Sequence, residues 1–194
     1  DKKVSSKATV PILWDKKTNT IVNNESAEII RIMNSAFNKI TKNFDDYYPS
    51  NLRPEIDKIN KITYENINNG VYKSGFSKTQ SAYEDAVKKL FSSLEMIDKI
   101  LTGKEYLVGN QLTEADIRLI PTLLRFDSVY HVHFKCNLKK ISEFKNISHY
   151  VKKLFNIPAI HSTTDFNHIK RHYYYSHESI NPNRIIPVGP EKPF

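Results

Sequence analysis

The sequence has very little cysteine and no long apolar segment. One cysteine, Cys136, occurs among 194 residues, so an internal disulfide framework is excluded and a reducing compartment is favoured. No stretch approaches the ~18 consecutive apolar residues of a transmembrane helix. The first residues, DKKVSSKATV, lack the apolar region of a secretory signal. We therefore expect a cytoplasmic protein, although an organellar leader ahead of Asp1 would not be visible in this sequence.

Concentrated basic charge is also missing. The formal net charge is +8, yet lysines are interleaved with acids in segments such as Glu55–Lys58 and Glu84–Lys89, which is typical of solvated helix faces. Nucleic-acid binding needs a basic patch or a recognisable motif, so we do not expect it to be the main function. His131 and His133 would share a face on a strand, but no third ligand follows at zinc spacing, and we expect no metal site.

What is present begins with two short strands and a helix. The segments Val10–Leu13 and Thr20–Val22 are joined by turn-forming residues and predict a hairpin. Pro11 is unfavourable in a central strand, which leaves two interpretations, an edge strand or an unusual Val10–Pro11 peptide bond. From Ala27 onward the apolar residues recur at helical spacing. Residues 39–54 are polar, aromatic and interrupted by proline, as expected of a linker.

The chain after this linker is predicted to be helical. Apolar residues recur at helical spacing in Glu55–Asn68, Thr79–Leu101 and Ile147–Phe155. Thr113 and Asp116 have the spacing of a capping box, which predicts that another helix begins there. Residues 176–194 contain four prolines and little periodicity, so we expect an extended tail.

Four blocks of the sequence carry a resemblance to a known family. They are TVPILWDKKTNTIVNNESAEIIRIMNSAF (9–37), NINNGVYKSGFSKTQSAYEDAV (66–87), LTEADIRLIPTLLRFDSVYHVHFKCNLKKI (112–141) and DFNHIKRHYYYSH (165–177). In this order they resemble the xi class of glutathione transferases, the glutathionyl-hydroquinone reductases. The resemblance implies a mainly α fold, in which a glutathione transferase C-terminal helical domain follows a partial thioredoxin-like ββα unit. We expect that partial domain at 1–38, a linker at 39–54, the helical domain at 55–175 and the tail at 176–194.

The resemblance also bears on the nucleophile. In the family this is a cysteine in a CPWA-like motif, at the first strand–helix turn of the thioredoxin-like domain. The chain resembles the family from a point after that turn, and Cys136 falls in the expected helical domain. We therefore expect that the chain corresponds to about three-fifths of such an enzyme, lacks the nucleophilic cysteine, and is inactive by itself.

By the same resemblance, Val10, Pro11, Glu25 and Ser26 are glutathione-binding residues. A cis Val10–Pro11 bond would turn the Val10 backbone outward, where it could pair with glutathione as an added strand. The helix N-terminus would bind the γ-glutamyl carboxylate, with the Ser26 hydroxyl as an additional donor and Glu25 near the α-ammonium group. The alternative is that Ser26 or Asn24 simply caps the helix.

Tyr72, Tyr130 and Tyr173 match three tyrosines that the family places at its active site. The resemblance implies that Tyr72 is the general acid or base, and that Tyr130 and Tyr173 assist the thiolate and the substrate. A phenol ring can stack on a quinone, and its hydroxyl can bond to or exchange a proton with the quinone oxygens. Tyr174 and Tyr175 are expected to be ordinary core or surface residues.

For the intact protein, the resemblance implies reduction of S-glutathionyl-hydroquinones to hydroquinones through an enzyme–glutathione mixed disulfide. It further implies glutathione as co-substrate, a quinone-derived small-molecule substrate and a homodimer, while the lack of a long apolar segment predicts no membrane association. Two alternatives stay open, an omega-like thioltransferase or dehydroascorbate reductase, and a non-catalytic transferase-like interaction module. The tyrosine-containing blocks argue against the module.

Overall fold

The computed structural model describes residues 9–194 of the chain. The chain divides into two compact units, 1–50 and 51–194, and the division falls inside the segment 39–54. Residues 1–8, which belong to the expected first domain and to the region searched for a signal, lie outside the described residues. Among residues 9–194, no helix is long and apolar enough to cross a membrane.

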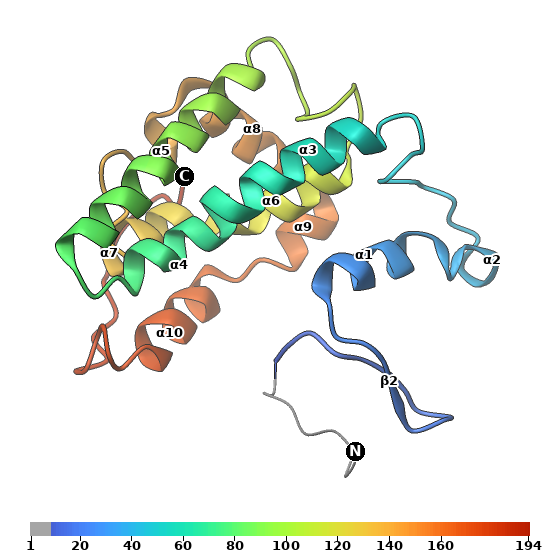
Figure 1. The fold of residues 1–194 in the computed structure, drawn as a ribbon, viewed down its shortest axis with the longest axis horizontal. Coiled ribbons are helices and arrows are strands. Elements are labelled where there is room, and N and C mark those ends of the chain that lie inside the picture. The colour runs from blue at the N-terminus through green and yellow to red at the C-terminus, as the bar shows by residue number, and fades with distance from the viewer. Residues whose placement is uncertain (1–8) are drawn as a thin grey trace. The chain divides into compact units, whose positions relative to one another are not determined.

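The first unit is a hairpin followed by helices. Strands β1 (Leu13–Asp15) and β2 (Thr20–Asn23) pair antiparallel, and helices α1 (Ser26–Ser35) and α2 (Asn38–Thr41) follow (Figure 1). The hairpin and α1 confirm the predicted ββα order. The first strand begins later than predicted, because Pro11 has no amide hydrogen to give to a ladder. The turn is stabilised by the Asp15 carboxylate, which accepts hydrogen bonds from the Lys17 and Thr18 amides at 2.7 and 3.3 Å.

This first unit has no fully buried residue among its described residues, 9–50. Large apolar side chains are instead exposed on the hairpin and on both helices. Burial of such side chains is the main source of folding free energy, so this unit has little stabilisation of its own. The exposed set is Val10, Ile12, Trp14, Val22, Met33, Phe37, Ile40 and Phe44.

The second unit is entirely helical in its regular structure. Helix α3 packs on α6, α4 on α5, and α8 on both α5 and α6, so that the long helices lie side by side (Figure 1). The apolar faces meet in a core whose largest members include Phe126, Phe134 and Tyr150. The helices are α3 (Arg53–Thr63), η1 (Tyr64–Asn68), α4 (Asn69–Gly75), α5 (Gln80–Ile100), α6 (Glu114–Arg125), η2 (Phe126–Tyr130), α7 (His131–His133), η3 (Ile141–Glu143), α8 (Lys145–Phe155), α9 (Pro158–Ser162) and α10 (Phe166–Ser176).

The capping box at the start of α6 is confirmed. The buried Asp116 carboxylate accepts from the Thr113 amide at 2.8 Å and from the Leu107 amide at 2.9 Å. It also accepts from the Tyr150 hydroxyl at 2.8 Å. The box therefore does more than start a helix, because it joins α6 to α8 and to the loop before it.

The helix predicted at Glu55–Asn68 is longer than its apolar pattern indicated. Pro54 lies in the first turn of α3. Backbone N–H groups in a first turn have no intrahelical acceptor, so a proline there costs no hydrogen bond. After α3 the chain continues through the π-helix η1 directly into α4. A π-helical turn holds one more residue than an α-helical turn, so the 3.6-residue period shifts at η1 and the continuation into α4 was not predicted.

Candidate functional site

The first unit brings the expected glutathione-binding residues into one small region. The Val10–Pro11 peptide bond is cis, as the resemblance implied, and Val10 is 91% exposed. The Asn24 side-chain amide donates to the Pro11 carbonyl at 2.6 Å and to the Thr9 carbonyl at 3.3 Å. Asn24 thereby holds the Val10–Pro11 backbone next to the residues that begin α1.

Glu25 is the N-cap residue of α1, and no side chain there makes a capping hydrogen bond. The alternative in which Ser26 or Asn24 caps the helix is not the arrangement found, because the Asn24 side chain bonds to the Thr9 and Pro11 carbonyls and Ser26 is already inside the helix. The first intrahelical bonds run from the Glu28 and Ile29 amides to the Glu25 carbonyl. The amides of Ser26 and Ala27 precede them, which is the usual setting for binding a carboxylate at a helix N-terminus.

The second unit brings the three expected tyrosines together. The Tyr173 hydroxyl lies 2.7 Å from the Tyr72 hydroxyl and 2.8 Å from the Tyr130 hydroxyl. Tyr72 comes from α4, Tyr130 ends η2 and Tyr173 lies in α10. Tyr72 is 39% exposed, whereas Tyr130 and Tyr173 are buried. The arrangement is a chain of three hydroxyls that leads from the interior to one accessible phenol, and we call it the tyrosine cluster.

The surroundings of Tyr130 and Tyr173 favour the protonated form of their hydroxyls. Burial raises the pKa of Tyr130 well above its usual value, and the neighbouring Tyr173 and Tyr72 raise it further. Burial likewise raises the pKa of Tyr173, while the Arg125 guanidinium opposes the increase at both residues. Both buried hydroxyls are therefore neutral near pH 7, and each can donate one hydrogen bond.

Phe134 holds the tyrosine rings in place. Its ring is fully buried, stacks on Tyr130 with centroids 5.3 Å apart, and lies 5.2 Å from the Tyr72 ring. Gly75 makes this position available, because a Cβ there would lie 2.3 Å from Phe134 Cδ1. Such a distance is far inside van der Waals contact. Gly75 thus leaves room for the Phe134 ring, which packs against the tyrosine cluster.

The π-helix η2 also contributes to the position of Tyr130. All five residues of η2 are buried, and the carboxylate of Asp127 in its first turn accepts from the Ile141 and Ser142 amides at 2.6 and 3.1 Å. These bonds anchor η2 to η3. Single π-helical turns are frequent at functional sites, because the inserted residue redirects the side chains that follow.

His131 and His133 do not lie on a strand. They form the helical turn α7, so the shared face that a strand would give them is lost. His133 is buried, and its Nε2 lies 3.1 Å from Nδ1 of His177. Burial lowers the pKa of His133 to about 4 and also lowers the pKa of His177. Within the described part of the chain, no group of three or more His, Cys, Asp or Glu side chains is arranged to bind a metal ion.

Cys136 lies in surroundings typical of a structural cysteine. It is fully buried, and burial raises the pKa of its thiol to about 12. Its sulfur lies 3.7 Å from the Phe134 carbonyl and 4.0 Å from the Val71 carbonyl. A neutral, inaccessible thiol is a poor nucleophile.

Three residues of this region were not singled out from the sequence, namely Gly75, Phe134 and Arg125. Gly75 and Phe134 occur in the GVYKSGF and YHVHFKCN blocks, but the contact between them depends on how α4 and α7 meet. Arg125 occurs in the same 112–141 block as Phe134, but nothing in the sequence singled it out. His172 lines a pocket beside Tyr173, whereas the neighbouring Arg171 does not.

Comparison with known proteins gives glutathione transferases and glutathionyl-hydroquinone reductases. The family model described as "Glutathione S-transferase, C-terminal domain" matches residues 80–153. The chain is 54% identical to glutathionyl-hydroquinone reductase PcpF of Sphingobium chlorophenolicum, covering 100% of this chain and 62% of that protein. It is 50% identical to glutathionyl-hydroquinone reductase YqjG of Escherichia coli, covering 98% of this chain and 58% of that protein. The chain thus spans about three-fifths of the length of these curated relatives.

Solved structures agree over the whole chain. Glutathione transferase Xi 1 from Trametes versicolor is 55% identical with a TM-score of 0.95, over 100% of this chain and 68% of that one. The glutathione-bound structure of YqjG from Escherichia coli is 50% identical with a TM-score of 0.95, over 99% of this chain and 62% of that one. The chain belongs to the Xi class of the glutathione transferases.

Proposed function

We propose that the intact protein is a glutathione-dependent reductase that converts S-glutathionyl-hydroquinones to hydroquinones. The observation that supports this most is the tyrosine cluster, in which Tyr173 bridges Tyr72 and Tyr130 at 2.7 and 2.8 Å. Three phenols in contact offer rings for stacking and hydroxyls for the oxygens of a hydroquinone. The relatives named as glutathionyl-hydroquinone reductases support the same substrate class, with glutathione as the co-substrate.

The proposed reaction has two steps, a reductive cleavage of the carbon–sulfur bond of the conjugate and a thiol–disulfide exchange. A cysteine thiolate, supplied by a thioredoxin-like segment outside this chain, attacks the sulfur of the conjugate, and the carbon–sulfur bond breaks. The ring takes the bonding electron pair and one proton, which releases hydroquinone and leaves an enzyme–glutathione disulfide. A second glutathione attacks this disulfide, which releases glutathione disulfide and restores the thiolate.

The residues of this chain have three roles in the proposal. Val10 and Pro11 present the backbone that pairs with glutathione, and the α1 N-terminus with Glu25 and Ser26 binds its γ-glutamyl end. Tyr72 is the acid or base at the accessible end of the tyrosine cluster, and its hydroxyl moves the proton that the ring requires. Tyr130 and Tyr173 orient that hydroxyl and the substrate.

The chain alone is proposed to be inactive, and the intact protein is proposed to be a cytoplasmic homodimer. The exposed apolar side chains of residues 9–50 support the view that further protein covers this unit in the intact enzyme. Sedimentation of the intact protein tests the dimer, since a monomer at micromolar concentration contradicts it.

Product stoichiometry tests the reaction. The intact protein, given an S-glutathionyl-hydroquinone and glutathione, is expected to release hydroquinone and glutathione disulfide in equal amounts. Turnover by the 194-residue chain alone contradicts the proposal, as does an intact protein that leaves the conjugate unchanged.

A second candidate is an omega-like thioltransferase or dehydroascorbate reductase, because a relative from Schizosaccharomyces pombe that is 48% identical is named "Glutathione S-transferase omega-like 2". A panel that contains dehydroascorbate and a mixed disulfide beside the hydroquinone conjugate distinguishes the two. Preference for the conjugate supports the first proposal.

A further inference from the structure

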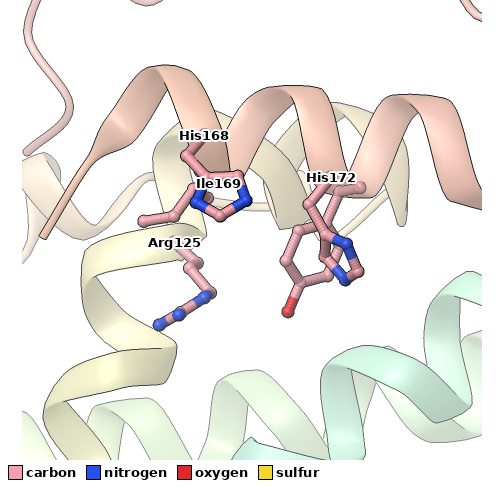
Figure 2. Close-up of a pocket in the computed structure, with 5 residues that line it drawn as sticks. Arg125, His168, Ile169 and His172 are labelled. Carbon is pink, nitrogen blue, oxygen red and sulfur yellow. The ribbon is translucent and has the colours of Figure 1, made fainter.

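A small pocket lies beside the tyrosine cluster, between α6 and α10. It has a volume of about 190 Å³ and is lined by Arg125, His168, Ile169, His172 and Tyr173. Figure 2 shows Arg125 on α6 next to the face of α10 from which His168, Ile169 and His172 project. Tyr173, the middle member of the cluster, forms part of the wall. The pocket therefore adjoins the tyrosine cluster through Tyr173.

Among the described residues, the lining of this pocket carries the positive charge of Arg125 and includes no acidic side chain. Arg125 is permanently charged, and among residues 9–194 its Nη1 donates to a neutral acceptor, the Pro121 carbonyl, at 2.7 Å. His168 and His172 are four residues apart, so they lie on the same face of α10. Asp165 is the N-cap of α10, and its carboxylate already accepts from the His168 amide at 3.0 Å. The charge of Arg125 is thus available to a ligand.

The charge of Arg125 also reaches the tyrosine cluster. It lowers the pKa of both Tyr130 and Tyr173 against the stronger effect of burial. An anion in the pocket would therefore lie within electrostatic range of the hydroxyls that are proposed to act on the substrate ring.

The size of the pocket limits what it can hold. A cavity of about 150 Å³ accepts one benzene molecule, whereas pockets that enclose larger ligands measure about 300–1,000 Å³. At about 190 Å³ the pocket fits a ring edge with a small substituent, and it is too small for a whole glutathionyl conjugate. The guanidinium fork matches a carboxylate in a bidentate geometry.

We propose that the pocket of Arg125, His168 and His172 is a carboxylate subsite, which gives the enzyme a preference for hydroquinones with an acidic group on the ring. Arg125 binds the carboxylate, and the two imidazoles supply further hydrogen bonds. The ring then lies against Tyr173, with its hydroxyls toward the tyrosine cluster. This inference rests on the proposed function, because it specifies the substrate class of the same site.

Binding to the 194-residue chain tests the subsite directly. The probes are 2,5-dihydroxybenzoate, a hydroquinone with a carboxylate, and 2,5-dihydroxybenzamide, its neutral counterpart. Charge-assisted hydrogen bonds to Arg are about twice as strong as neutral ones, so we expect the acid to bind about tenfold more tightly than the amide in an isothermal titration. Equal affinities, or no measurable binding of the acid, overturn the proposal.

Variants at two arginines, Arg125 and Arg171, separate the subsite from general surface charge. Arg125→Met is expected to abolish the preference for the acid. Arg171→Met removes the same charge from another face of α10, where Arg171 is exposed and does not line the pocket, and it is expected to keep the preference. Thermal unfolding of both variants checks that they fold, and Arg125→Lys, which keeps the charge, is expected to retain part of the preference. An equal loss in both methionine variants overturns the proposal.

A competition experiment tests which carboxylate the pocket binds, that of the ring substituent or one of glutathione, because glutathione also carries carboxylates. Free glutathione is expected not to displace 2,5-dihydroxybenzoate from the chain, and displacement overturns the assignment to a ring substituent.

Turnover by the intact protein separates the proposed subsite from the proposed reductase function. If a neutral conjugate is reduced but the carboxylated one is no better, the subsite is wrong and the reductase stands. If neither conjugate is reduced, the proposed function is wrong, and the binding preference of the chain still decides the subsite.

Discussion

The Tyr173 hydroxyl lies within hydrogen-bond distance of both Tyr72 and Tyr130, at 2.7 and 2.8 Å. A hydroxyl has one proton and two lone pairs, so Tyr173 can accept from one neighbour while it donates to the other. The bridge connects the deeply buried Tyr130 with the accessible Tyr72. Any change in the protonation of Tyr72 can therefore be followed by a rearrangement of the hydrogen bonds behind it.

Removal of the bridging hydroxyl is expected to destabilise the chain. In Tyr173→Phe, the buried Tyr130 hydroxyl loses the partner that the structure records for it. An unsatisfied buried polar group costs about 1–3 kcal/mol, so we expect the free energy of unfolding in urea to fall by that amount. Tyr175→Phe is the matched control, because Tyr175 is 53% exposed, and it is expected to leave stability unchanged. Equal effects of the two variants contradict the bridge.

Substitution of Gly75 is expected to disturb the tyrosine cluster through Phe134. In Gly75→Ala the new Cβ would lie 2.3 Å from Phe134 Cδ1, so Phe134 or α4 must move. Overpacking of this kind costs about 1–3 kcal/mol. Gly70→Ala on the same helix is the control, since its Cβ would be 3.6 Å from the nearest atom, Leu90 Cδ1. It is expected to be neutral or stabilising by up to about 1 kcal/mol. Urea denaturation of both variants measures the difference, and a stable Gly75→Ala protein contradicts the role of Gly75.

The His133–His177 pair is expected to make stability depend on pH. Burial lowers the pKa of His133 to about 4 in the folded chain, whereas an unfolded histidine has a pKa of about 6.5. The unfolded state therefore binds more protons between these values, so this contribution is complete above pH 6.5 and is lost as the pH falls toward 4. His133→Gln should flatten the decrease in unfolding free energy between pH 7 and 5. His149→Gln, at an exposed position, should not, and equal slopes in both variants refute the assignment.

Cys136 is expected to be unreactive in the folded chain. Its thiol is fully buried and has a pKa of about 12, so almost no thiolate is present or accessible at pH 8. An aromatic disulfide reagent should modify no thiol in the native chain and one thiol per chain in denaturant. Fast stoichiometric reaction of the native protein would show that Cys136 is not enclosed as described.

Much of the helical domain could be predicted from the sequence. The capping box of Thr113 and Asp116 and the apolar period of α5 depend on residues close together in the chain, so they are visible without the structure. The π-helices η1 and η2 could not be predicted this way, because the extra residue in each turn breaks the period on which the prediction relies. The prediction that placed His131 and His133 on a strand was wrong for a related reason. The π-helix η2 continues directly into α7, so the helical period is broken just before these residues.

For the candidate site, the residues that could be identified before the structure are clearly separate from those that could not. Tyr72 and Tyr173 are 101 residues apart, and nothing in their spacing indicates contact; the resemblance to a family supplied that expectation. Arg125 lies in the 112–141 block but was assigned no role there, because its importance comes from a pocket that residues of α6 and α10 line together. Asn24 was expected at most as a cap, and its hydrogen bonds to the Thr9 and Pro11 carbonyls depend on the path of the Val10–Pro11 segment.

The most direct test of the tyrosine cluster is the rate of hydroquinone release by the intact protein carrying Tyr72→Phe. Loss of a general acid or base lowers turnover by about 10²–10⁴-fold, so we expect kcat to fall at least 100-fold, with the ring of residue 72 still in place. Tyr64→Phe removes a hydroxyl from another exposed tyrosine and is expected to leave kcat within about twofold, as for a surface change. An undiminished kcat in Tyr72→Phe would contradict the central claim that this hydroxyl takes part in the reaction.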